Sequence, residues 1–322
     1  MILYTGGKTG GHIIPLVSLI DNKDESIYVG YSGYLEEKIC KENNITFIGL
    51  DSKNGKLTNI FKGIVFLFKR LKKLKIKAVV STGGFVSAPL IFYAILKRIP
   101  IYLLEENLIM GKFNQYIYPF ASKIFLAHPL PKMKKKFIHT GIPMKDITVS
   151  NKNEKYDVLI IGGSLGSKHL CDIAYSVSKN YKTLLIAGRY YNEYKEDYNL
   201  KIIEFSNDIY NLIQNSKIVI SRCGAVATYE VMYLNKPLIV VPSEKTKRNH
   251  QVINAKYFDD NGLALMVKED ELKDNLIEKI NNIMTNVDLK IEMTIRQRLY
   301  IKKDSKERIR RIINELWWIC QN

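Results

Sequence analysis

The stretch ILYTGGKTGGHIIP, residues 2–15, decides the fold. It begins with a short β-prone apolar run, continues through a turn that holds four glycines, and ends in residues that suit the start of a helix. A short buried strand followed by a glycine-rich turn and a helix is the opening of a βαβ unit. The stretch therefore predicts a parallel α/β sheet with the glycine-rich turn at its carboxyl edge.

The same order recurs in IIGGSLGSKHL, residues 160–170. Around both turns, short β-rich runs alternate with segments of helical period, which is typical of parallel sheets. The fold class is thus α/β, with two Rossmann-like doubly wound domains. We expect strands near residues 2–4, 26–29, 78–81, 101–104 and 123–127 in the first half and 158–161, 183–187, 202–204, 218–221 and 237–241 in the second.

The length and the break in periodicity place the domain boundary. A chain of 322 residues exceeds the about 250–300 at which a single core stops growing. Residues 129–156 are rich in Pro, Lys and polar residues and keep neither period, so we expect a linker near residues 144–153. We assign residues 1–145 and 146–304 to the two domains. The charged helical segment at about 305–322 could complete the second domain or pack back on the first.

The charge is uneven along the chain. The formal net charge is +17, and residues 1–150 hold 22 basic against 10 acidic residues, a net of +12. Such a field attracts nucleic acid, an anionic membrane or a phosphorylated substrate. The aromatic residues are not interleaved with the basic ones in an RNA-binding pattern, so we expect no nucleic-acid partner.

Composition also limits where the protein works. The four cysteines are too widely spaced for a metal pair and too few for a disulfide framework, which fits a reducing cytoplasm. The N-terminal MILYTGG lacks the basic region and the apolar stretch of a signal peptide, and no run reaches the about 18 apolar residues of a membrane span. Any membrane contact is therefore expected to be peripheral.

Residues 60–77, IFKGIVFLFKRLKKLKIK, offer a surface for such contact. The segment reads as an amphipathic helix that carries a cluster of Lys and Arg, which is the pattern that binds an anionic bilayer surface. A helix buried on one face with a solvated basic face is the alternative.

Both glycine-rich turns are candidate phosphate cradles, because glycine permits close approach of the backbone and the following helix presents unpaired N–H groups. Neither turn is a dinucleotide fingerprint or a Walker loop, which argues against hydride transfer and ATP hydrolysis. Ordinary tight βα turns are the alternative. His12 follows the first turn and is a candidate general base, although a helix start is expected to lower its pKa. A structural histidine is the alternative there.

Two stretches of the second half carry polar side chains beside strand ends. SRCGAVATYE, residues 221–230, opens a helix, and a carboxylate there can accept both hydroxyls of a ribose or merely stabilise the helix. VPSEKTKRNHQVINA, residues 241–255, supplies polar residues beside a basic cluster, which suits a sugar and its diphosphate or a solvated loop.

Taken together, the chain resembles the MurG family of N-acetylglucosaminyltransferases. The resemblance covers nearly the whole chain and is carried, in the family's order, by TGGKTGGH, STGGFVSAP at residues 81–89, LLEENLIMGKFN at 103–114, GGSLGS, SRCGAVATYE and HQVINA. It implies the GT-B arrangement, in which the two domains face a cleft, and an inverting transfer of GlcNAc from UDP-GlcNAc. The C4 hydroxyl of undecaprenyl-pyrophosphoryl-MurNAc-pentapeptide would be the acceptor.

The resemblance also implies roles for individual residues. His12 would be the catalytic base, Asn107 would lie near the transferred sugar, and Glu230 would bind the ribose. The full set implied to bind UDP-GlcNAc comprises Thr9, Gly10, Gly11, Asn107, Lys145, Ser164, Ala225, Thr228, Glu230, His250 and Gln251. No metal and no cofactor is expected. The implied location is the cytoplasmic face of the bacterial membrane, held there through residues 60–77.

Three departures from the family pattern affect the site. Leu104, Glu105, Glu106 and Asn107 stand where many members have His-Glu-Gln-Asn. The usual Asn-Pro-Val-Arg appears as IPMK, residues 142–145, and Lys145 keeps the charge without the bidentate fork of an arginine. Leu165 replaces a common Gln. The alternatives left open are another GT-B glycosyltransferase with a lipid or polysaccharide acceptor, and a UDP-GlcNAc epimerase.

Overall fold

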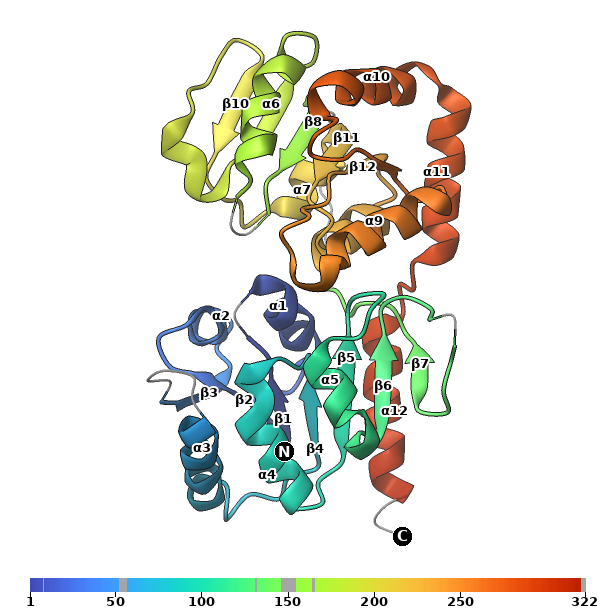
Figure 1. Cartoon of the computed structure of the whole chain (residues 1–322). Coiled ribbons are helices and arrows are strands. Elements are labelled where there is room, and N and C mark those ends of the chain that lie inside the picture. Colours follow the sequence, from blue (N-terminus) through green and yellow to red (C-terminus); the bar gives the residue numbers. More distant parts are fainter. Residues whose placement is uncertain (8, 52–56, 131, 146–154, 164–165, 320–322) are drawn as a thin grey trace. The chain divides into compact units, whose positions relative to one another are not determined.

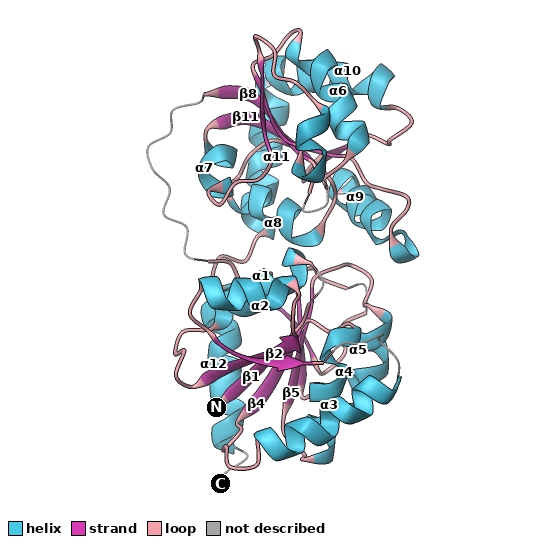
Figure 2. Ribbon diagram, turned by 90° about the vertical axis from the view of Figure 1, so that its left-hand side faces the viewer, coloured by secondary structure: helices cyan, strands magenta, loops and turns pink. Residues whose placement is uncertain are grey.

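The computed structural model describes residues 1–7, 9–51, 57–130, 132–145, 155–163 and 166–319 (Figures 1 and 2). The chain forms two compact units. The first unit is Met1–Lys145 with Lys302–Asn322, and the second is Asp146–Ile301.

The first unit contains a seven-stranded parallel sheet in the order β3-β2-β1-β4-β5-β6-β7. The chain starts in the middle at β1 and winds outward to one edge, then returns to β4 and winds to the other. This order places the switch point between β1 and β4. The strands are β1 (Ile2–Thr5), β2 (Ser26–Tyr31), β3 (Thr46–Leu50), β4 (Ala78–Ser81), β5 (Ile101–Glu105), β6 (Lys123–Leu126) and β7 (Phe137–His139).

Helices cover both faces of this sheet because neighbouring strand residues point in opposite directions. Leu3 and Leu103 face one side, where they pack in a core with α3, α4 and α5, whereas Tyr4 and Leu104 face the other, with α1, α2 and α12 (Figure 2). The helices are α1 (Gly10–Leu19), α2 (Leu35–Glu42), α3 (Leu57–Arg70), α4 (Ala88–Leu96) after the short turn η1 (Phe85–Ser87), α5 (Lys112–Ile117) with the turn η2 (Tyr118–Phe120), and α12 (Ser305–Ile319).

The second unit repeats this plan with a six-stranded parallel sheet in the order β10-β9-β8-β11-β12-β13. Its switch point lies between β8 and β11. The strands are β8 (Tyr156–Ile161), β9 (Thr183–Ile186), β10 (Leu200–Ile203), β11 (Ser216–Ser221), β12 (Leu238–Val240) and β13 (Leu265–Met266).

One face of the second sheet shares a core with α6 and α10, while α7 and α8 pack against β11. The helices of this unit are α6 (Lys168–Ser178), η3 (Gly188–Glu193), α7 (Ile209–Gln214), α8 (Ala225–Tyr233), η4 (Lys247–Asn249), α9 (His250–Asp260), α10 (Leu272–Thr285) and α11 (Val287–Tyr300).

The last helix, α12, belongs to the first unit. Ile309 and Ile313 are buried in the same core as residues of α1 and β4. The Arg310 guanidinium forms an ion pair with Asp21 and donates to the carbonyl of Leu19, 2.9 Å away. The chain thus leaves the first unit after Lys145, builds the second, and returns to the first at Lys302.

The parallel α/β fold of both halves is confirmed. The ten expected strands are present, but three short edge strands, β3, β7 and β13, were not predicted. Each of the three lies at a sheet edge, and β7 and β13, with three and two residues, are partly exposed along their length. Strands this short at an edge do not stand out from the sequence as the longer inner strands do. In the part of the chain described, no helix is both long enough and apolar enough to cross a membrane.

Candidate functional site

The residues picked out in the first half meet at the carboxyl edge of the first sheet, at its switch point. Thr9 is the residue before α1, and Gly10, Gly11 and His12 form its first turn. The Thr82 hydroxyl, just after β4, donates to the carbonyl of His12 over 2.9 Å. Gly6 cannot be replaced without movement, because a Cβ there would lie 2.1 Å from the Thr82 oxygen. The first glycine-rich turn is therefore held against the loop after β4.

His12 forms an ion pair across the switch point. Its Nδ1 lies 3.0 Å from Oε2 of Glu106, which follows β5. The Glu106 side chain is 5% exposed and the His12 side chain is 38% exposed. The imidazole thus has one edge against a buried carboxylate and retains a face that solvent or substrate can reach.

This contact reverses the expected effect of the helix start on His12. The negative charge of Glu106 raises the pKa of His12 to about 9, against the opposing effect of burial, and Glu105 adds to the rise. The expectation of a lowered pKa was wrong, because a full carboxylate charge in contact outweighs the partial charge at a helix N-terminus.

Glu105 organises the loop that carries Asn107. Its carboxylate accepts hydrogen bonds from the backbone N–H of Asn107 at 3.2 Å and of Gly111 at 2.8 Å, and from the Asn114 side-chain amide at 3.0 Å. Burial raises the pKa of Glu105, and these donors act against the rise. Asn107 is thereby fixed beside the His12–Glu106 pair by its own backbone.

The next strand end contributes a neutral group. His128 follows β6, is buried, and is hydrogen-bonded to the backbone of Glu106. Burial lowers the pKa of His128 to about 3, so it is uncharged at neutral pH. Sequence reasoning did not select Glu106 as a site residue or His128 at all, because their importance depends on a meeting of separate strand ends.

The second glycine-rich turn occupies the equivalent edge of the second sheet. Gly166 has φ +71° and would place a Cβ 2.5 Å from the Ala187 carbonyl oxygen, so only glycine fits. Ser167 caps α6, and its hydroxyl accepts from the N–H of Leu170 at 3.3 Å. The predicted phosphate contact Ser164, and Leu165 with it, lies outside the described residues.

Glu230 lies on α8, where Tyr210 orients it. The Tyr210 hydroxyl donates to Oε1 of Glu230 over 3.1 Å, and burial together with the Glu230 charge raises the pKa of Tyr210. Thr228 is fully buried and its hydroxyl donates to the backbone carbonyl of Gly224, so its side chain serves the helix start. Ala225 is the first residue of α8.

A second charged cluster gathers strand ends in this unit. Glu269 lies after β13, forms an ion pair with Arg222 after β11, and has Oε1 3.1 Å from Nδ1 of His169 on α6. Arg222 also donates to the carbonyl of Val241 at 3.2 Å. The sequence does not reveal this cluster, because its members are far apart along the chain.

His250 and Gln251 begin α9 after a strained turn. Arg248 and Asn249 both have left-handed backbone angles, with φ 60° and 51°. Oε1 of Gln251 accepts from the N–H of Ser243 at 2.9 Å, which ties α9 to the end of β12. Because the side-chain oxygen of Gln251 is engaged in this bond, its side-chain NH₂ is the group that can bind a ligand. Lys145 is exposed at the end of the first unit.

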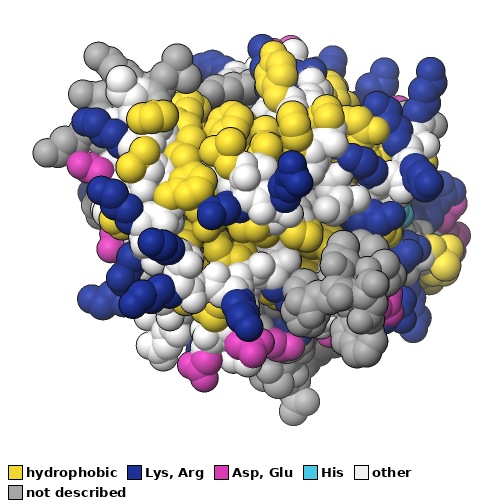
Figure 3. Space-filling model, turned by 90° about the horizontal axis from the view of Figure 1, so that it is seen from below, with side chains coloured by type: hydrophobic (Ala, Val, Ile, Leu, Met, Phe, Trp, Pro, Cys, Tyr) yellow, Lys and Arg dark blue, Asp and Glu magenta, His cyan; other side chains and the backbone are white. Residues whose placement is uncertain are grey.

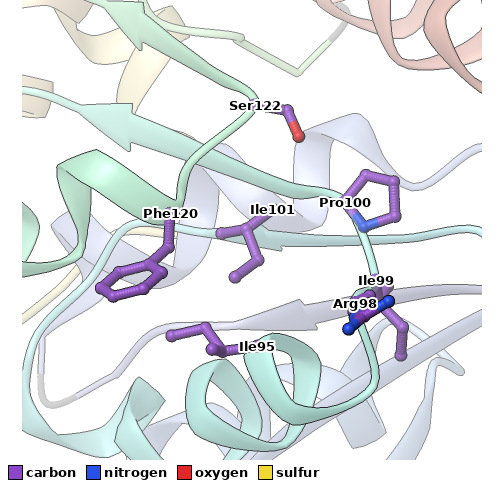
Figure 4. A pocket seen from close by; sticks show the side chains of 7 residues that line it. All are labelled: Ile95, Arg98, Ile99, Pro100, Ile101, Phe120 and Ser122. Carbon is purple, nitrogen blue, oxygen red and sulfur yellow. The ribbon is translucent and has the colours of Figure 1, made fainter.

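A small cavity of about 240 Å³ lies elsewhere, at the amino-terminal ends of β5 and β6 (Figure 4). Arg98 is its one charged lining residue, and the remainder are mainly apolar. The cavity is at the sheet edge opposite the glycine-rich turn and holds no group that could accept a proton. The carboxyl edge, with its charged and polar side chains, is therefore the better candidate site. The lining residues are Ile95, Arg98, Ile99, Pro100, Ile101, Phe120 and Ser122.

Family models match both units. The glycosyltransferase family 28 N-terminal domain matches residues 1–126, and the glycosyltransferase family 28 C-terminal domain matches residues 157–309. The N-terminal domain model thus covers β1 to β6 of the first sheet, and the C-terminal domain model covers the second sheet.

Curated relatives match nearly the whole chain. A protein of Clostridium botulinum (strain Alaska E43 / Type E3) is 31% identical over 92% of this chain and 97% of its own length. One of Borreliella afzelii (strain PKo) is 33% identical, covering 89% and 92%. Both are named UDP-N-acetylglucosamine–N-acetylmuramyl-(pentapeptide) pyrophosphoryl-undecaprenol N-acetylglucosamine transferase.

Solved structures share the fold. The MurG structure of Acinetobacter baumannii has a TM-score of 0.80 at 21% identity and covers 98% of this chain and 99% of its own. A putative UDP-N-acetylglucosamine 2-epimerase of Listeria monocytogenes has a TM-score of 0.66 at 11% identity and covers 96% and 94%. Transferases and epimerases therefore share this architecture, and the fold does not choose between their reactions.

Proposed function

Because this chain belongs to the MurG family of glycosyltransferases, we propose that it transfers GlcNAc from UDP-GlcNAc to the C4 hydroxyl of undecaprenyl-pyrophosphoryl-MurNAc-pentapeptide, with inversion. The observation that carries the chemistry is the His12–Glu106 pair beside the first glycine-rich turn. A base at the carboxyl edge of the sheet, next to a loop that can accept a diphosphate, is what attack by an acceptor hydroxyl requires.

The displacement proceeds in one step at the anomeric carbon. His12 takes the proton of the C4 hydroxyl as the oxygen forms its bond to C1. The bond from C1 to the phosphate oxygen breaks on the opposite side, and its electron pair leaves with UDP. Neutral His12 is the form that can accept the proton, so deprotonation of its imidazolium precedes the reaction.

We assign the donor to the second unit. Glu230 accepts from the ribose hydroxyls, with Tyr210 fixing the carboxylate. The start of α6 supplies backbone N–H groups for the diphosphate, whose charge grows as the bond to C1 breaks. The side-chain amide of Gln251 donates to the sugar, because its oxygen is engaged by Ser243. His250 lies next to it.

The lipid acceptor calls for contact with a membrane, and the first unit has a suitable face. On α3, Ile60 and Leu67 are buried, whereas Phe61 is 69% exposed and Phe66 is 43% exposed. The helix ends at Arg70, so residues 71–77 continue the basic segment without helical structure. The predicted amphipathic helix is therefore real but shorter than residues 60–77.

Figure 3 shows an apolar surface on the first unit with Lys and Arg around it. α3 packs against α4, where Phe92 and Leu96 are also exposed, and the small cavity connects α4 to exposed Phe120. We name this surface the apolar face. Its apolar side chains can insert into the bilayer. Each basic residue near an anionic bilayer surface adds about 1 kcal/mol of electrostatic binding free energy. The exposed basic residues of its segment are Lys62, Lys69, Arg70, Lys72, Lys73 and Lys75.

The test is release of UDP from UDP-GlcNAc by the purified chain, with and without the lipid-linked muramyl pentapeptide. Acceptor-dependent release with formation of the disaccharide lipid supports the proposal. Release or isomerisation of UDP-GlcNAc in the absence of any acceptor favours the epimerase. Release with a diacylglycerol or polysaccharide acceptor, and none with the muramyl lipid, favours another glycosyltransferase of this fold.

A further inference from the structure

Glu106 is a buried carboxylate whose principal partner is His12. Oε2 lies 3.0 Å from Nδ1 of His12, and among the described residues Oε1 has no hydrogen-bond partner. An isolated buried carboxylate is costly, and an adjacent imidazolium offsets that cost. The pair therefore has a reason to exist in the resting protein, before any substrate binds.

The geometry of imidazole decides which nitrogen is available. The two ring nitrogens lie on different sides of the ring, so a histidine with Nδ1 against Glu106 directs Nε2 away from that carboxylate. The 38% exposure of the His12 side chain means that a substrate hydroxyl can reach the ring. The same division of labour between an orienting carboxylate and a proton-accepting Nε2 operates in acid–base triads.

We propose that Glu106 is the positioning residue of the transfer reaction: it fixes His12 with Nδ1 toward its carboxylate and leaves Nε2 as the atom that accepts the proton of the acceptor hydroxyl. The role rests on the proposed function, because it needs a hydroxyl nucleophile. In the reaction the O–H bond breaks, its proton binds Nε2, and the imidazolium that forms is stabilised by Glu106.

The groups around the pair do not replace Glu106. Glu105 also favours the imidazolium, but its carboxylate is bonded to the backbone of Asn107 and Gly111. His128 is neutral at pH 7, and the buried phenol of Tyr28, whose pKa is raised, is neutral as well. Removal of the Glu106 charge should therefore change the titration of His12 directly.

This role has a consequence for pH. His12 is protonated in the resting protein up to a pKa of about 9, so the rate should rise with pH until that value. Without the Glu106 charge, the pKa of His12 falls, and the rising part of the profile moves to lower pH. Without the Glu106 charge, a larger fraction of His12 is neutral at pH 7. The imidazole is then a weaker base, and its ring is less firmly oriented.

The experiment is an NMR titration of the His12 ring in the full chain, for the wild type, Glu106→Gln, Glu106→Asp and Glu42→Gln. Glu42 is an exposed carboxylate of α2 and serves as the control. We expect the pKa of His12 to fall by about two units in Glu106→Gln. It should fall less in Glu106→Asp, which keeps the charge, and should not change in Glu42→Gln. An unchanged pKa in Glu106→Gln would overturn the pairing.

The pH profile of kcat/KM for the same proteins tests the positioning role. The rising limb should follow the pKa of His12 in each protein, and Glu106→Asp should restore part of the wild-type profile. If His12 shifts in the NMR titration while the limb stays in place, Glu106 does not act on the reaction. Absence of transfer by the wild type would instead reject the proposed function, and the NMR titration would still decide the pairing.

Discussion

Nδ1 of His12 and Oε2 of Glu106 lie 3.0 Å apart although the residues belong to different βα units, one following β1 and the other following β5. The contact spans the switch point of the first sheet. The Glu106 charge raises the pKa of His12, whereas the helix start alone would lower it. The basicity of His12 therefore depends on the strand order that brings Glu106 next to it.

Loss of the imidazole should abolish most of the activity. We expect His12→Ala to lower kcat for acceptor-dependent UDP release by a factor of about 10² to 10⁴, the usual contribution of a general base. Binding of UDP, measured by calorimetry, serves as the control and should be unchanged, because the residues that we propose hold the nucleotide, such as Glu230, lie in the second unit. A variant with wild-type kcat would remove His12 from the mechanism.

Loss of the Tyr210 hydroxyl should weaken donor binding rather than catalysis. Tyr210→Phe removes the donor to Glu230, so the carboxylate is less fixed where it would meet the ribose. We expect KM for UDP-GlcNAc to rise by about 3- to 10-fold with kcat changed little. Tyr210 acts on the ribose only through Glu230, so its loss forfeits only part of the about 1.5–3 kcal/mol that a hydrogen bond to a charged group contributes. Tyr198→Phe, on a 97% exposed side chain, is the matched control. An equal KM in both variants contradicts the assignment.

The apolar face should govern binding to anionic vesicles. Phe61→Ser and Leu96→Ser each remove an exposed apolar side chain, 69% and 63% exposed, and should reduce co-sedimentation with phosphatidylglycerol vesicles several-fold. Tyr198→Ser removes a more exposed side chain from the second unit and should have no effect. Transfer to a soluble acceptor analogue should be unaffected in all three. Equal losses in all three variants would show that the apolar face is not special.

Docking of α12 should stabilise the first unit. Ile313→Ala leaves a cavity in the core shared with α1, and we expect it to cost about 2–4 kcal/mol in the free energy of unfolding. Glu315→Ala, at an exposed position of the same helix, should cost less than about 0.5 kcal/mol. Urea unfolding of the two variants compares these values. Similar midpoints would mean that α12 leaves the first unit in solution.

Two histidines should give the first unit a pH optimum of stability. The pKa of His128 is lowered to about 3, so its contribution is present above the unfolded value of 6.5 and is lost as pH falls below it, by up to about 1.4 kcal/mol per unit. The pKa of His12 is raised to about 9, so its contribution is present below 6.5 and is lost as pH rises toward 9.

The optimum is checked by urea unfolding between pH 5 and pH 9. His128→Gln should weaken the acid-side loss, and His12→Gln should weaken the alkaline-side loss. If each variant kept the slope of the wild type on its own side, the two contacts would not control the pH dependence.

Sequence by itself determined the class of the fold and singled out His12 and Glu230 as candidate site residues. The inner strands of a doubly wound sheet are buried on both faces, so Ala78–Ser81 and Ile218–Ser221 read as strands without further context. The glycine-rich turns follow such strands directly, and His12 follows the first of them. These features depend on neighbouring residues, which a single sequence shows.

Only the tertiary structure decided which of those residues act on one another. Glu106 is next to Glu105 in sequence, yet Glu105 holds the backbone of its own loop while Glu106 reaches His12. The contact of Glu269 with Arg222 and His169 likewise arises from strand order. The return of α12 to the first unit and the burial of Thr228 arise from the packing of helices. A parallel sheet brings the ends of distant strands to one edge. The pKa of a group at that edge depends on its burial there and on the charged side chains that the other strand ends place next to it.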